Sequence, residues 1–260
     1  MSMTIQQAVD RITSQFKGKA GKHTVDTIKS GDPSQPVRGI AVTFMATRDV
    51  LTQAAAKGVN LIVTHEPTFY NHADEEEWLR NDPIRNSKRK FIDEKGIAIW
   101  RSHDLPHIHQ PDMIVTGMAR ELGWEKHQVS PHGYVIAPLT LEKLAQYAKE
   151  KLGIKTVRYA GDPKMTCAKV SLRVGAGGGR GAIDDLMAGA DVVLAGESPE
   201  WETCEYVRDA AAAGEKKALI VLGHANSEEG GMKWMSEWIA GLLPEIPVTH
   251  IPAGDPFRFI

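Results

Sequence analysis

The sequence predicts an α/β protein of two similar lobes, each with a mixed, largely parallel sheet flanked by helices. Short apolar runs typical of strands alternate with longer segments whose apolar residues recur at helical spacing. The strand runs, such as LIV at residues 61–63, are continuously apolar, as in parallel sheets buried on both faces. A chain of 260 residues is long enough for two small lobes or for one layered domain.

The elements of the first lobe are predicted in chain order. Apolar residues at helical spacing predict a first helix, and the stretch after it, rich in Gly, Lys, Asp and Pro, is predicted as a loop. Strand, helix and strand then follow one another. The predicted segments are a helix at 4–16, a loop at 18–36, strands at 37–44, 59–65 and 97–103, and helices at 48–58, 82–96 and 112–123.

The second lobe continues the alternation of strands and helices. Its predicted strands are 133–138, 157–161, 167–175, 190–196, 218–224 and 248–251, and its helices are 141–153, 182–189, 199–214 and 227–243. The pattern is interrupted near residues 125–135, so we expect lobes at 1–128 and 129–260 with a metal site at their interface. A single compact domain is the alternative.

The composition excludes several classes of function. The formal net charge of −2 provides no general attraction for nucleic acid or an anionic membrane surface. No apolar run approaches the roughly 20 residues that span a bilayer, and the first residues lack the pattern of a signal segment. Cys167 and Cys204 have no metal-like spacing, so a reducing cytoplasm is expected.

Three of the predicted strands end in residues that can bind a metal ion. Functional groups gather outside the carboxyl ends of parallel strands, so these three ends are expected to converge. Imidazole and carboxylate together suit zinc, manganese, iron or cobalt, and a bridging carboxylate would allow two ions. The residues at the three ends are His65 and Glu66, then His103, Asp104 and His107, then His224 and Glu228.

The two neighbouring glutamates after His224 are predicted to have different roles. Asn226 is a good N-cap, and Glu229 three residues later completes the pattern of a capping box. Glu228 would then point back toward His224 as a ligand. His109, which follows the second strand end, has no clear partner and is predicted to be structural.

These motifs together resemble the Nif-three-like family of dinuclear metal-centre proteins, whose members are named as homologues of a GTP cyclohydrolase. The resemblance is carried by THEP, by HDLPH, by GHANSEEG and by the Gly-rich segment GAGGGRGAIDDLMAGADVVLAGES, over about residues 4 to 255. It implies a short member without the inserted domain of longer ones. It also implies a homohexamer with metal sites facing an internal cavity.

The resemblance also implies a set of five metal ligands. Two positions depart from the family pattern, because Glu66 stands where the family has a second histidine and His107 stands where it has an aspartate. The balance of imidazole and carboxylate is nevertheless kept. His103 and Asp104 remain alternatives for the central ligand. The implied ligands are His65, Glu66, His107, His224 and Glu228.

Two further residues are candidates for substrate chemistry. Arg180, in the turn GAGGGRG, can meet an anionic substrate, although a turn that lets the backbone approach the site closely is the preferred interpretation. Glu197, at another strand end, can act as general base or as outer partner of a ligand.

The sequence therefore supports two functions. The first is a dinuclear hydrolase with two divalent ions, using a metal-bound hydroxide on a small nucleotide, heterocyclic or phosphorylated substrate. The alternative is a non-catalytic, metal-binding regulatory scaffold. An open coordination position facing a pocket would distinguish the hydrolase from the scaffold.

Overall fold

The computed structural model describes residues 2–260, which form two compact units. The first unit comprises Met1–Met113 and Met232–Ala253, and the second comprises Ile114–Gly231 and Gly254–Ile260. The division expected at residue 128 thus falls inside the second unit. The segment 232–253 belongs to the first unit because its strand β10 (Val248–His250) pairs with β2 (Ile40–Thr43).

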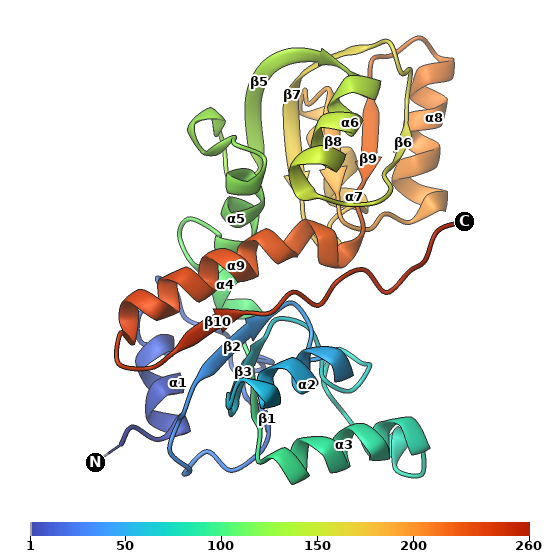
Figure 1. The fold of residues 1–260 in the computed structure, drawn as a ribbon. Helices are drawn as coiled ribbons and strands as arrows, with labels where there is room; N and C mark the ends of the chain where they lie inside the picture. Colours follow the sequence, from blue (N-terminus) through green and yellow to red (C-terminus); the bar gives the residue numbers. More distant parts are fainter. Residues whose placement is uncertain (1) are drawn as a thin grey trace. The chain divides into compact units, whose positions relative to one another are not determined.

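The first unit is built on a five-stranded sheet in the order β1-β4-β3-β2-β10 (Figure 1). Strand β1 pairs antiparallel with β4, and the other neighbours are parallel. Every residue of the three central strands is buried, as their continuous apolar runs predict. The strands not yet given are β1 (Ile28–Ser30), β3 (Leu61–Thr64) and β4 (Ala98–Arg101).

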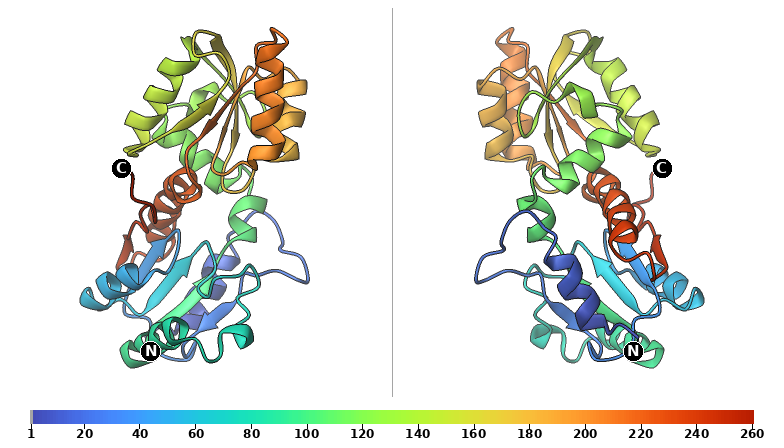
Figure 2. Two further views of the ribbon diagram at one scale, coloured as in Figure 1. Left: turned by 90° about the vertical axis from the view of Figure 1, so that its right-hand side faces the viewer. Right: turned by 90° about the vertical axis from the view of Figure 1, so that its left-hand side faces the viewer.

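Helices cover both faces of this sheet. Helices α2 and α3 pack on the face formed by Ala41, Ile62 and Ile99, whereas α1 lies on the opposite face (Figure 2). Thr47 caps α2, and Gly96 ends α3 in the left-handed conformation, as their positions predict. The bounds are α1 (Ile5–Thr13), α2 (Arg48–Ala56), the 3₁₀ turn η1 (Glu77–Leu79), α3 (Pro83–Lys95), α4 (Asp104–Ile108) and, entering from the second unit, α9 (His224–Leu242).

The second unit has a similar five-stranded sheet in the order β5-β7-β8-β9-β6. The central strands are parallel, and the two outer strands pair antiparallel with their neighbours. The strands are β5 (Gly133–Thr140), β6 (Arg158–Ala160), β7 (Thr166–Arg173), β8 (Val192–Ala195) and β9 (Ala218–Val221). The mixed α/β class predicted from the sequence is confirmed.

The alternation of side chains along these strands supplies two cores. Val170, Val192 and Ile220 face α5 and α6, whereas Val193 and Leu219 face α7 and α8. The helical segments are α5 (Met113–Glu121), η2 (Glu125–His127), α6 (Leu141–Leu152), α7 (Arg180–Met187), the π-helical turn η3 (Glu200–Cys204) and α8 (Glu205–Ala212).

The start of α9 corrects one prediction. Gly223 has φ +96°, and the helix begins directly after it at His224 rather than after Asn226. Asn226 therefore lies in the first turn, where its amide donates to the carbonyl oxygen of Leu222 at 2.8 Å. The predicted N-cap at Asn226 is wrong, because the left-handed glycine turns the chain earlier than the capping pattern suggested.

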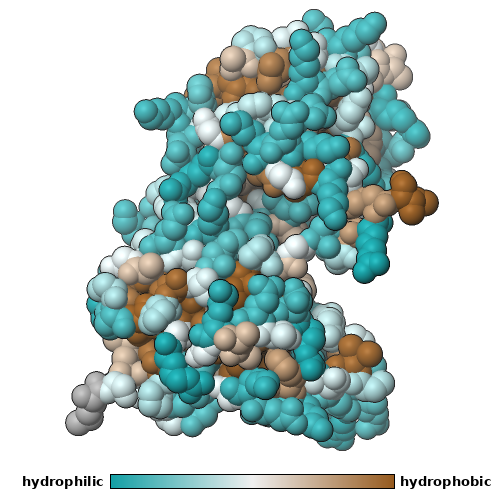
Figure 3. All heavy atoms as spheres, viewed as in Figure 1, coloured by the Kyte–Doolittle hydropathy of each residue, from teal (hydrophilic) through white to brown (hydrophobic). Residues whose placement is uncertain are grey.

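No helix among the described residues is both long and apolar enough to cross a bilayer. Figure 3 shows hydrophilic side chains over most of the face drawn, interrupted by smaller hydrophobic areas. Scattered apolar exposure of this kind is usual for folded proteins.

Candidate metal site

The carboxyl ends of β3 and β4 bring three histidines together in the first unit. The strands are parallel neighbours, with Thr64 opposite Arg101. His65 follows β3 directly and His103 follows β4 after one residue, so both side chains leave the sheet at the same edge. The short helix α4 then returns His107 to this edge.

The three imidazoles lie in contact. The rings of His65 and His103 stack with 4.6 Å between centroids, and His107 meets them edge-on at 5.1 and 5.4 Å. A nitrogen from each ring lies within 4.8 Å of a nitrogen from the other two. Metal–nitrogen bonds of about 2.1 Å from one ion to all three would require the rings to move closer together.

Each of these imidazoles directs its Nδ1 atom toward an oxygen. The pairs are His65 with the carbonyl oxygen of Ser102 at 3.2 Å, His103 with Oδ1 of Asp104 at 3.0 Å, and His107 with Oδ2 of Asp112 at 3.0 Å. A carbonyl or ionised carboxylate oxygen only accepts, so Nδ1 carries the proton and the lone pair is on Nε2. Metal-binding histidines are oriented in this way. The residues present therefore fit a divalent ion held through Nε2 atoms.

Asp104, one of the alternatives for the central ligand, orients His103 in this arrangement. Its Oδ2 also accepts a hydrogen bond from Oγ1 of Thr24 at 2.8 Å. Burial alone would raise the pKa of Asp104, but the hydrogen bonds from His103 and Thr24 outweigh burial and lower it. The three alternatives thus separate into two imidazoles that face His65 and one carboxylate that supports His103.

His109 lies on the same segment and shows the opposite arrangement. Its Nδ1 accepts a hydrogen bond from the backbone N–H of Lys17 at 3.0 Å, and its ring packs against Phe16 and Trp238. Burial, followed by the charge of Lys17, lowers the pKa of His109. This histidine has a packing role, as predicted.

Glu66 lies between the histidine cluster and a buried arginine. Its Oε1 is 3.8 Å from Nε2 of His103, and its Oε2 is 3.4 Å from Nη2 of Arg101. The Arg101 side chain is fully buried and also donates to the carbonyl oxygens of His65 and His72. A buried guanidinium requires such acceptors. Arg101 therefore fixes the loop that carries both His65 and Glu66.

The second unit has a smaller group of one histidine and two carboxylates. His224 is the first residue of α9, and its Nε2 is 3.4 Å from Oε2 of Glu228 one turn later. Its Nδ1 is 3.4 Å from Oε1 of Glu197, which follows β8. The expectation that Glu228 points back toward His224 agrees with this geometry.

Gly175, the first residue of the Gly-rich turn, lies against this group. A Cβ atom at this position would be 2.2 Å from Oε1 of Glu228 and 3.0 Å from Nε2 of His224. The backbone there has φ +58°, a conformation that favours glycine. The close backbone approach expected for this turn thus occurs at Gly175.

Comparison with known proteins adds an independent observation. A family model described as Duf34/NIF3 (NGG1p interacting factor 3) matches residues 25–255. The chain belongs to the Duf34/NIF3 family. The match includes the ends of β3, β4 and β9, so the family resemblance predicted from the motifs is confirmed.

Relatives of this Duf34/NIF3 chain include proteins named "GTP cyclohydrolase 1 type 2 homolog". The protein from Clostridium perfringens is 24% identical over 243 residues, covering 88% of this chain and 89% of the relative. The one from Escherichia coli K12 is 26% identical over 234 residues, covering 85% and 87%. These names describe likeness to an enzyme, and they assign no reaction to the present chain.

Solved structures share the fold over the whole chain. A Bacillus cereus protein related to NIF3 superposes with a TM-score of 0.81 at 14% identity, covering 100% of both chains. A Staphylococcus aureus hypothetical protein gives a TM-score of 0.79 at 17% identity, again covering 100% of both. At such identities the likeness supports the Duf34/NIF3 fold alone.

The two residues predicted for substrate chemistry lie in different surroundings of the second unit. Glu197 contacts His224, and 59% of its side chain is exposed. Arg180 opens α7 and pairs with Asp184 on the same helix at 3.1 Å, with 80% of its side chain exposed. Among the described interactions, Glu197 joins the His224 group and Arg180 does not.

Residues that support the histidine cluster but were not predicted from the sequence include Arg101, Asp112 and Asp26. Asp112 is five residues after His107, so its pairing was accessible from local spacing. Asp26 accepts hydrogen bonds from the backbone N–H groups at the start of α4, 77 residues away from His103. No local pattern signals a contact over that distance.

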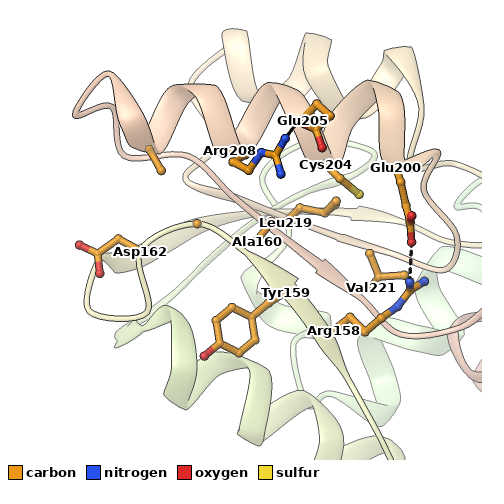
Figure 4. A pocket seen from close by; sticks show the side chains of 12 residues that line it. Arg158, Tyr159, Ala160, Asp162, Glu200, Cys204, Glu205, Arg208, Leu219 and Val221 are labelled. Atoms are coloured by element: carbon orange, nitrogen blue, oxygen red, sulfur yellow. Dashed lines mark hydrogen bonds and ion pairs between the residues drawn. The ribbon is translucent and has the colours of Figure 1, made fainter.

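A separate cavity of about 510 Å³ lies in the second unit between β6 and α8 (Figure 4). Its apolar surface includes Leu219 and Val221, and the ion pair of Arg158 with Glu200, 3.0 Å long, lies at one end. No histidine lines it, and its acidic residues belong to none of the candidate metal groups found among residues 2–260. The cavity is therefore distinct from the candidate metal site.

Proposed function

We propose that this Duf34/NIF3 protein is a metal-dependent hydrolase that acts on a small nucleotide, heterocyclic or phosphorylated substrate. One observation carries the proposal: three imidazoles meet with every Nδ1 directed to an oxygen, beside a carboxylate. The proposed ligands of a first ion are His65, His103, His107 and Glu66.

A divalent ion bound there would supply Lewis-acid chemistry and a lowered pKa for coordinated water. The protein's own contribution is orientation. Asp104 and Asp112 fix the rings of His103 and His107, so that their Nε2 atoms keep their direction. Arg101 balances the charge of Glu66 and ties down its loop. A preorganised ligand group of this kind binds an ion without the entropy cost of ordering its side chains.

The proposal extends to a second ion, with His224 and Glu228 as ligands. One imidazole and one carboxylate are suitable donors for the same class of metals. For Glu197 we propose the role of outer partner to His224, with general base as the alternative. The two-ion centre, the homohexamer and the cytoplasmic location are proposals that rest on family resemblance and composition.

Elemental analysis of protein purified without chelator tests the metal sites. Two ions per chain are expected, and loss of one ion is expected in the variant Glu228→Ala. Full metal content in a protein carrying both His65→Ala and Glu228→Ala would overturn the proposal.

A screen of phosphoester, cyclic amide and nucleotide hydrolysis tests the reaction class. Turnover should require added Zn²⁺, Mn²⁺, Fe²⁺ or Co²⁺ after treatment with a chelator. Stoichiometric metal without turnover on any of these substrates would favour the regulatory, metal-binding alternative.

A further inference from the structure

We infer that Arg101 is a positioning residue for Glu66, holding one carboxylate oxygen so that the side chain offers only Oε1 to an ion bound by the histidines. The inference deepens the proposed function and rests on it, because it concerns the same ligand group. It assigns a role to a residue outside the predicted ligand set.

The two oxygens of Glu66 face different partners. Oε2 lies 3.4 Å from Nη2 of Arg101, within hydrogen-bonding reach. Oε1 lies on the side of the histidines, 3.8 Å from Nε2 of His103. Only 12% of the Glu66 side chain is exposed, so a rotation that exchanges the two oxygens would move a carboxylate within a packed site.

Arg101 cannot easily be displaced from this position. Its Nε donates to the carbonyl oxygen of His65 at 3.0 Å, and its Nη1 donates to that of His72. Asp74 adds a carboxylate 3.6 Å from Nη1. A planar guanidinium satisfies several acceptors in fixed directions, whereas the ammonium group of a lysine does not. The planar guanidinium of Arg101, fixed by its other acceptors, therefore sets the direction of its hydrogen bond to Glu66.

This arrangement has a consequence for ligand number. A carboxylate that binds through both oxygens occupies two coordination positions of an ion, and one that binds through a single oxygen occupies one. With Oε2 held by Arg101, Glu66 would bind the ion through Oε1 alone and occupy one coordination position. Room then remains beside the three imidazoles for water or substrate.

Arg101 could instead act only as a clamp for the loop, through the carbonyl oxygens of His65 and His72. The two roles differ in their dependence on Glu66. A positioning role disappears when Glu66 can no longer act as a carboxylate, whereas a clamping role persists. A double-mutant cycle between positions 101 and 66 therefore separates them.

The test measures binding of Zn²⁺ and Co²⁺ to the full chain by competition with a coloured chelator. Arg101→Lys should weaken binding about ten- to a hundredfold, the usual effect of losing an outer partner of a ligand. In a Glu66→Gln background the same substitution should change affinity by less than about threefold. Asp74→Asn is the matched control, since it removes another carboxylate charge beside Arg101 but keeps the pair of Arg101 and Glu66.

Unchanged affinity in Arg101→Lys would overturn the inference while leaving the proposed function intact. An equal loss in the Glu66→Gln background, or an equal loss in Asp74→Asn, would also overturn it in favour of a clamp. If the unsubstituted protein bound neither ion, the proposed function and the inference would both fail.

A second measurement needs no arginine variant. Infrared difference spectra of the Zn²⁺-loaded and metal-free protein contain carboxylate bands, and the bands lost in Glu66→Gln belong to that residue. A wide separation between its asymmetric and symmetric stretches is expected for binding through one oxygen. A narrow separation, as for binding through two oxygens, would refute the inference even if Arg101→Lys failed to fold.

Discussion

The two units hold their ionisable groups in different ways. In the first, three imidazoles face one another and a separate oxygen orients each ring. In the second, the single imidazole of His224 lies between two carboxylates, each 3.4 Å away. The first unit thus contains a candidate group of three imidazoles, whereas the second contains one imidazole between two carboxylates. Metal affinity should depend more strongly on the first.

The largest expected effect concerns single histidine ligands. His103→Ala should weaken binding of the tighter Zn²⁺ ion by more than about a hundredfold, because loss of a mere outer partner costs up to that amount. His224→Ala should weaken the same ion by less than about tenfold. Isothermal titration with Zn²⁺ measures both, and His109→Gln serves as the histidine control. Equal losses of Zn²⁺ affinity in His103→Ala and His224→Ala would contradict the stronger dependence expected for the first unit.

A buried lysine also contacts the segment that follows His65 and Glu66 in the first unit. Nζ of Lys88 donates to the carbonyl oxygen of Thr68 at 2.7 Å, and burial lowers the pKa of Lys88 to about 8 from 10.5. Between these values the unfolded chain binds more protons than the folded one, so stability rises with pH. The resulting increase in the free energy of unfolding should approach about 3 kcal/mol at pH 10.5 and vanish below pH 8.

Urea unfolding at pH 7, 9 and 10.5 measures this gain as a difference between the unsubstituted protein and Lys88→Met. The difference isolates Lys88 from other groups that titrate in the same range. A difference that stays constant with pH would show that the charge of Lys88 is well solvated.

The next largest effect on metal binding is expected from the carboxylates that orient the histidine rings of the first unit. Asp112→Ala removes the acceptor that fixes the ring of His107, and it should weaken Zn²⁺ binding about ten- to a hundredfold. Asp93→Ala, on the exposed side of α3, is the matched carboxylate control. Identical affinities of the two variants would mean that the ring of His107 needs no orientation.

The smallest effect is expected at the glycine turn of the second unit. Gly175→Ala combines a left-handed backbone with a clash against Glu228, and it should cost about 1–3 kcal/mol of stability. Gly153→Ala has a similar φ of +64° but open space around it, so it measures the backbone strain alone. The first substitution should cost more in urea unfolding. If both cost the same, the close approach at Gly175 carries no strain.

The sequence predicted the parts of this molecule that local chemistry determines. Strand ends such as His65 and His103 followed apolar runs, and Thr47 and Gly96 cap two helices whose predicted ranges, 48–58 and 82–96, begin or end at these positions. Strand β1 was missed because its three residues, Ile28–Ser30, lie in a Gly- and Pro-rich stretch and pair only at one edge of the sheet. An edge strand of this length carries too little periodicity to be recognised.

The candidate site divides in the same way. The sequence indicated the histidines because they lie at or beyond strand ends, but it left His103, Asp104 and His107 as alternatives, since their side-chain directions are not visible in a sequence. Those directions depend on Thr24 and Asp26, which are about 80 residues away in sequence. Such contacts arise from tertiary packing, which a single sequence does not reveal.

Because β10 pairs with β2, the first sheet cannot be completed until nearly the whole chain has been synthesised. All strands of the second sheet lie between residues 133 and 221, so that sheet can close before Val248–His250 has been made. The outer edge of β2 stays open during that interval, and open strand edges attract other chains. The sheet whose first strands are translated first is therefore the sheet that receives its last strand last.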